Sequence, residues 1–161
     1  RVGKKDPRPR VQMRFINQIV THYKKYELTK NQLQKTSLWT TRNEAISKII
    51  PTRKFNGWVG RIYRLTTNND GNANLSIILK RRVTLETTDT FLGMGHSSVI
   101  APNTTLYRKL FNMKKGQMVK VSGSFFSDRR KFVKQGNIME YFSMLTPSYI
   151  VKYSKIESLK K

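Results

Sequence analysis

The residues of this sequence that could do chemistry are basic side chains, several of them beside an aromatic ring. Lysine and arginine bind phosphate groups, and tyrosine and phenylalanine rings stack on exposed nucleic-acid bases. Three short segments combine or concentrate these types, and their members are Arg61, Tyr63, Arg64, Lys80, Arg81, Arg82, Arg129, Arg130, Lys131, Phe132 and Lys134. We expect the basic members to contact phosphates, and Tyr63 and Phe132 to stack on bases. The alternative for each segment is an ordinary solvated surface.

The charge of the whole chain points to an anionic partner. Its 161 residues include 32 lysines and arginines but 9 aspartates and glutamates, so the formal net charge is +23. A small chain with this charge repels itself unless a polyanion or an anionic surface neutralises it. Basic residues occur both in the first 54 residues and in the remainder. The sequence therefore does not show whether they form one groove, and an even basic coat would also suit a subunit of a large assembly.

Signals for catalysis are weak. The two histidines, His22 and His96, lie in unrelated segments, and no HExxH, P-loop or G-x-S-x-G motif occurs. The run GMGHSS at 93–98 is typical of a flexible connector. Cysteine is absent, which excludes disulfides, thiolate metal sites and cysteine nucleophiles. We therefore expect no enzyme activity, no cofactor and no metal site.

Two kinds of periodicity follow one another along the chain. Apolar residues recur every three or four positions between 11 and 50, which predicts a helical segment that ends at Pro51. Beyond this point the pattern changes to short strands with one helix among them. We predict strands at 57–65, 75–79, 82–88, 117–126, 138–145 and 148–156, a helix at 104–113, and loops at 91–98 and 127–137.

Three strands, a helix and two or three further strands follow the order of the OB fold, a partly open Greek-key barrel. We therefore expect a mainly β protein: an OB-like barrel of five or six strands, with an N-terminal α-helical extension and one helix between strands 3 and 4. Gly60 and Gly123 are the expected sites of sharp strand bends. A β-sandwich or an SH3-like barrel is the alternative. The expected organisation is a flexible basic arm at 1–10, a helical extension at 11–54 and the barrel at 55–161.

Several longer runs lie in and before the barrel segment. They are NQLQKT at 31–36, TRNEAI at 41–46, GWVGRIYRL at 57–65, NNDGNANLSI at 68–77, TLETT at 84–88 and KKGQMVKVSGSFF at 114–126. Together these runs resemble an OB-like domain of uncharacterised bacterial proteins, in which a similar helical segment precedes the tryptophan. The resemblance covers roughly residues 31–156 and implies the fold and a bacterial source, without implying a particular activity. The chain differs from that group in its unusually basic character and in segment 127–137.

These features predict non-catalytic binding of nucleic acid, with single strands or RNA preferred, because an OB groove stacks exposed bases. The alternative is a structural subunit of a larger bacterial assembly, held by protein contacts through helices 11–50 and the barrel edge. A membrane surface is the least favoured partner, because the barrel needs the apolar face of the amphipathic helix at 11–26. The chain begins at Arg1, so the sequence leaves open whether a signal or anchor precedes it, and a cytoplasmic location is the expectation.

Overall fold

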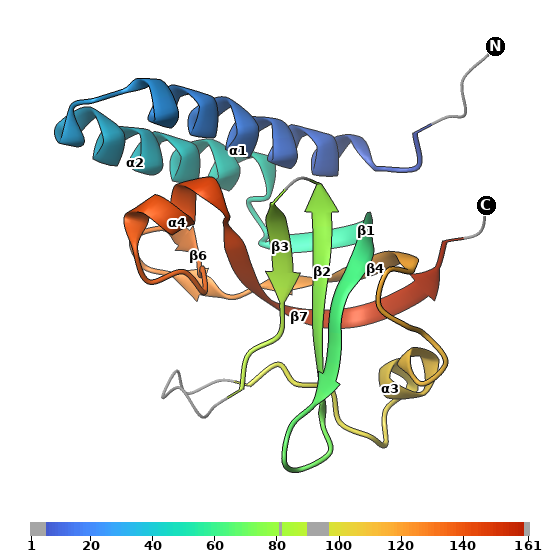
Figure 1. Cartoon of the computed structure of the whole chain (residues 1–161). Coiled ribbons are helices and arrows are strands. Elements are labelled where there is room, and N and C mark those ends of the chain that lie inside the picture. The colour runs from blue at the N-terminus through green and yellow to red at the C-terminus, as the bar shows by residue number, and fades with distance from the viewer. Residues whose placement is uncertain (1–5, 81, 90–96, 160–161) are drawn as a thin grey trace.

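A helical hairpin lies across one end of a β-barrel (Figure 1). The computed structural model describes residues 6–80, 82–89 and 97–159. The hairpin consists of α1 (Arg10–Leu28) and α2 (Gln32–Ile49), which run antiparallel to each other. The predicted helical extension is therefore confirmed.

Five strands close the barrel. They are β1 (Lys54–Thr67), β2 (Ala73–Lys80), β3 (Val83–Glu86), β4 (Met118–Phe125) and β7 (Ser148–Ser158). Their order around the barrel is β1-β2-β3-β7-β4, and β4 pairs with β1 to close it. The β3–β7 pair is parallel, the other pairs are antiparallel, and helix α3 (Thr105–Leu110) connects β3 to β4. This connectivity confirms the predicted OB-like barrel with a helix between its third and fourth strands.

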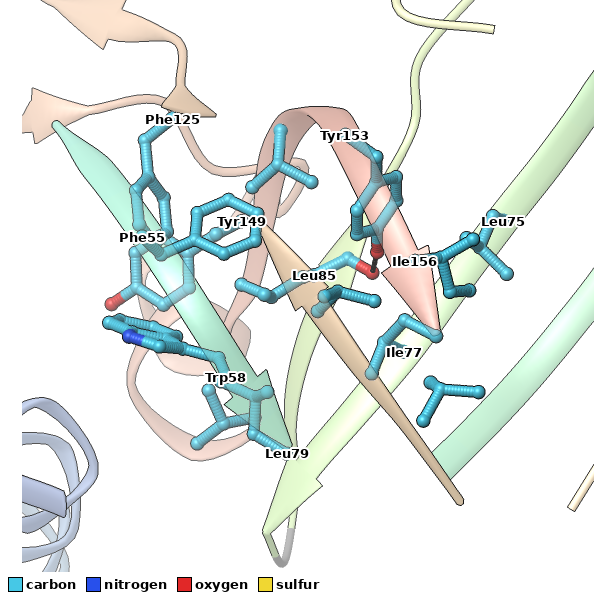
Figure 2. Packing of buried hydrophobic residues seen from close by; sticks show 14 of the residues in the cluster. Phe55, Trp58, Leu75, Ile77, Leu79, Leu85, Phe125, Tyr149, Tyr153 and Ile156 are labelled. Carbon is cyan, nitrogen blue, oxygen red and sulfur yellow. Dashed lines mark hydrogen bonds between the residues drawn. The ribbon is translucent and has the colours of Figure 1, made fainter. Parts of the chain in front are cut away.

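Aromatic rings fill the end of the barrel beneath the helices. The ring centroid of Phe15, from α1, lies 5.0 Å from that of Trp58, 5.6 Å from that of Phe125 and 5.4 Å from that of Tyr149. Figure 2 shows these barrel aromatics together with Phe55 on one side of the core, and an aliphatic group beside Tyr153 on the other. That group consists of Leu75, Ile77, Leu85 and Ile156. Because Phe15 completes the aromatic cluster, the hairpin and the barrel share one hydrophobic core.

A buried glutamine also joins α1 to the barrel. The side-chain Nε2 of Gln12 donates to the carbonyl oxygen of Val59 at 2.7 Å, and the Val59 amide donates to Gln12 Oε1 at 2.8 Å. The β1–β2 pairing begins only at Arg61, so Val59 lies where β1 has no β2 neighbour. The glutamine amide therefore satisfies backbone groups that burial would otherwise leave unpaired.

The two predicted bend glycines are sites of close strand approach. A Cβ atom at Gly60 would lie 2.8 Å from the carbonyl oxygen of Ile78. At Gly123 it would lie 2.9 Å from the Cα of Tyr153 and would collide with the carbonyl oxygen of Lys152. Gly123 also adjoins a register shift in the β4–β7 pair. Both positions require glycine because another backbone occupies the space of a side chain.

The strand predicted at 138–145 is wrong, because most of that segment forms helix α4 (Glu140–Leu145). The strand β7 already pairs with both β3 and β4, so no barrel edge remains for an additional strand. An acidic residue in the first turn also favours a helix. Within the predicted loop at 127–137, β5 (Ser127–Asp128) and β6 (Phe132–Val133) form a short hairpin outside the barrel.

Candidate nucleic-acid interface

The first predicted cluster lies on the exposed side of β1. Arg61, Tyr63 and Arg64 are exposed, and Tyr63 has half of its surface accessible. A guanidinium nitrogen of Arg61 donates to the carbonyl oxygen of Gly116 at 2.9 Å, and the Lys115 ammonium lies 5.8 Å from the centroid of the Tyr63 ring. The cluster therefore combines an aromatic ring with two nearby cations, which is the arrangement expected of a base-stacking site.

The second cluster lies at the turn between β2 and β3. Lys80 and Arg82 are exposed, whereas Arg81 lies outside the described residues. The guanidinium of Arg82 is 6.0 Å from the centroid of the Tyr23 ring on α1. Hydrogen bonds from Arg8 lower the pKa of Asp6 to about 2, and Lys80 adds a minor electrostatic contribution. Lys80 and Arg82 therefore lie toward the helical end of the barrel.

The third cluster lies on the β5–β6 hairpin, against α2. Arg53 covers the Phe132 ring: its guanidinium carbon is 4.0 Å from the ring centroid, and its Nε donates to the Phe132 carbonyl oxygen at 2.8 Å. The Lys131 ammonium lies 4.1 Å from the centroid of the Trp39 ring. Arg129 and Arg130 are exposed, and Lys134 is half-buried. Base stacking by Phe132 remains a prediction, and it requires the ring face opposite Arg53 or displacement of that arginine.

The structure brings the first two clusters onto one strand pair and places the third elsewhere. Arg61 pairs with Ile78, two residues before Lys80. The third cluster belongs to a separate two-stranded sheet, drawn beneath α2 beside α4 in Figure 1. The predicted site residues therefore do not line a single groove.

A row of basic and hydroxyl side chains on β1, β4 and β7 was not predicted. Lys54 of β1, Ser124 of β4 and Lys152 of β7 lie in register, and Ser122 pairs with Lys155 in the next row. We call this surface the lysine–serine face, and its members are Lys54, Asn56, Lys120, Ser122, Ser124, Lys152, Ser154 and Lys155. Two strand spacings place the Cα atoms of Lys54 and Lys152 about 10 Å apart, with Ser124 between them.

Hydrogen bonds fix the polar centre of this face. The Ser122 hydroxyl donates to Asn56 Oδ1 at 3.0 Å and accepts the Gly57 amide at 2.9 Å. The signal that would have found the face is the alternation of exposed lysines and polar serines with buried residues in 118–125 and 148–158. Val119 and Val121 are buried on either side of Lys120, for example.

The charge of the lysine–serine face is largely uncompensated. Between described residues, Lys155–Glu157 at 2.9 Å and Arg8–Asp6 at 2.7 Å are the only ion pairs. The outward side of β2 and β3 differs: there a polar groove of about 240 Å³ contains Arg64 together with Glu86 and Asp89. This is the side on which OB folds commonly bind ligands. The lysine–serine face is therefore the more strongly cationic of the two barrel surfaces.

His22 and Ser98 make hydrogen bonds to backbone groups. Burial lowers the pKa of His22, and its Nδ1 lies 2.7 Å from the carbonyl oxygen of Gln18. The Ser98 hydroxyl accepts the Thr88 amide at 2.8 Å. His96 and most of the connector at 91–98 lie outside the described residues. Among the residues that are described, no three histidine or acidic side chains are grouped as metal ligands would be.

Comparisons of the chain with protein families, with curated proteins and with solved structures found no match. Within the described residues, no helix combines the length and the apolar character needed to cross a membrane.

Proposed function

We propose that this protein binds nucleic acid without catalysing a reaction, and that it prefers single strands or RNA. The observation that carries the proposal is the lysine–serine face, where lysines from three strands surround serine hydroxyls. Both side-chain types bind phosphate oxygens. Among the described acidic residues, only Glu157 forms an ion pair with one of these lysines. A phosphate chain crossing this face would replace the counterions that Lys54, Lys120 and Lys152 otherwise require, because Lys155 is already paired with Glu157.

Binding through such a surface would depend little on base sequence. Lysine ammonium groups and serine hydroxyls recognise the backbone rather than a base edge. Tyr63 and Arg61 lie further along β1, where a base from the same strand could stack on the exposed ring. Stacking requires unpaired bases, and this requirement supports the preference for single strands or RNA. Lys80 and Arg82 would extend the basic surface toward the helices.

Fluorescence anisotropy with labelled single-stranded RNA, single-stranded DNA and duplex DNA, each across a salt series, tests this proposal. We expect submicromolar binding of single strands that persists at physiological salt. Tyr63→Ala should weaken the binding of single strands more than that of duplex. Binding that ignores strand type and disappears near about 0.2 M salt would indicate only nonspecific polyelectrolyte attraction, and would contradict the proposal.

The second candidate is a structural subunit of a larger bacterial assembly, held by protein contacts. Exposed apolar side chains around α4 favour it, with Ile138 97% and Met139 59% accessible. Nuclease treatment of the complex purified from its source distinguishes the two functions. Release of the partner supports nucleic-acid binding, whereas a complex that survives the nuclease supports protein contacts.

A further inference from the structure

An apolar groove lies between α1 and α4, next to the turn between β2 and β3. It has a volume of about 300 Å³. Six of its lining residues are Ile19, Val20, Tyr23, Met144, Leu145 and Pro147. We call it the α1–α4 groove. Two segments more than one hundred residues apart in the sequence therefore build one concave apolar surface.

Polar contacts hold α4 against the helical hairpin. The carboxylate of Glu140 accepts hydrogen bonds from the hydroxyl of Tyr26 at 3.0 Å, from Gln32 Nε2 at 3.0 Å and from the hydroxyl of Thr36 at 2.8 Å. Near the other end of α4, the Arg42 guanidinium donates to the Ser143 carbonyl oxygen at 2.7 Å. The groove is therefore already formed before any ligand binds, and a rigid site loses less entropy on binding.

Exposed aromatic side chains lie beside the groove. Tyr141 and Phe142 are each about half accessible, and their ring centroids are 5.3 Å apart in an edge-on arrangement. Tyr141 lies in α4 one helical turn before Met144 and Leu145, which line the groove. Exposed Ile138 and Met139 precede these rings. Large apolar side chains exposed close together on a protein surface are typical of an interaction site.

The charge around the groove selects its occupant. Arg82 lies at the rim, and no described acidic side chain forms an ion pair with it. A second copy of the chain is disfavoured, because each copy carries a net charge of +23. A concave site accepts a protruding side chain from another protein better than it accepts a membrane surface.

We propose that the α1–α4 groove binds an acidic segment of a partner protein, which inserts a large apolar side chain and directs carboxylates toward Arg82. This site does not depend on the proposed nucleic-acid binding, and its test scores the binding of peptides rather than of nucleic acid. A displayed library of random 12-residue peptides is selected on the whole protein. The variants Leu145→Gln and Arg82→Glu alter the groove, whereas Leu33→Gln and Arg108→Glu make the same changes at exposed positions outside it.

The selection should enrich peptides that combine one or two large apolar residues with several acidic ones. Each groove variant should weaken their binding about tenfold or more, and each control variant should leave it unchanged. Arg82 is exposed, so its variant tests the site even if Leu145→Gln lowers stability. Three results would overturn the proposal. They are no enrichment, enrichment of acidic peptides without apolar residues, and binding to phosphatidylserine vesicles that only the groove variants lose.

Discussion

Replacement of Gln12 tests whether the helical hairpin is part of the barrel fold. Gln12→Ala would leave both the amide and the carbonyl of Val59 without their partners, at a position where β2 cannot replace them. A buried unsatisfied backbone group costs about 1–3 kcal/mol. Water that enters beside the shortened side chain reduces the combined cost of the two unpaired groups, so we expect the free energy of unfolding to fall by about 3 kcal/mol.

Urea denaturation followed by circular dichroism measures this loss, and a thermal melt gives an independent estimate. For a chain of this length, about 3 kcal/mol lowers Tm by roughly 6–12 °C. Gln34→Ala is the matched control, because Gln34 is exposed on α2. It should change stability by less than about 0.5 kcal/mol.

Gln12→Glu separates the loss of the hydrogen bonds from the loss of packing. The introduced carboxyl group can donate to the Val59 carbonyl only when it is protonated. Its pKa in the folded protein should therefore lie above the ordinary value of about 4.3. The variant should approach wild-type stability at about pH 4 and lose stability as the pH rises through that raised pKa. Wild-type stability of Gln12→Ala, or of Gln12→Glu at pH 7, would refute the role assigned to this residue.

Three further predictions concern stability. Burial lowers the pKa of His22 below its ordinary 6.5, so the unfolded chain binds a proton more readily than the folded protein, and stability should fall as the pH drops from about 7 to about 5. In a pH series of urea midpoints, His22→Gln should flatten that part of the curve. An unchanged slope in the variant would contradict this prediction. Gly123→Ala should destabilise by about 3 kcal/mol in urea, because its Cβ would meet the Lys152 carbonyl, whereas Ser124→Ala on the same strand should cost far less. Arg42 is fully buried and donates to the backbone carbonyl oxygen of Ser143 and to the side-chain Oε1 of Gln135. Arg42→Lys should therefore cost about 2–4 kcal/mol in the same assay, and a neutral result would contradict the role of the planar guanidinium.

The local pattern of the chain was sufficient to predict the barrel. Buried hydrophobic residues recur at alternate positions in β2 and in the first half of β4, and the glycines at 60 and 123 mark places where strands approach closely. The segment 138–145 was misassigned because eight mostly apolar residues fit either a strand or a helix. The tertiary structure favours the helix, because β7 occupies the remaining edge of both β3 and β4 and leaves no partner for a strand at 138–145.

The candidate site was harder to predict because it depends on register. Runs such as Arg129, Arg130 and Lys131 are conspicuous in the sequence, but the structure packs that hairpin against α2. Lys54 and Lys152 are almost one hundred residues apart and meet only through the pairing of each with Ser124. The role of Gln12 was likewise invisible, because its partner is a backbone position on a distant strand. When a barrel is expected, single lysines at outward-facing positions of different strands indicate a binding surface as well as clusters of basic residues do.

The salt dependence of nucleic-acid binding by a lysine–serine face variant tests the central proposal most directly. The variant combines Lys54→Gln, Lys120→Gln and Lys152→Gln, and the control combines Lys24→Gln, Lys30→Gln and Lys48→Gln in the helical region. Both lose the same charge, and all six lysines are exposed. Each phosphate contact with a single strand contributes about 0.7 to the slope of log Kd against log salt concentration, so the face variant should lower that slope by about 2. The control should keep the wild-type slope, whereas equal losses in both variants, or no loss in the face variant, would contradict the proposed interface.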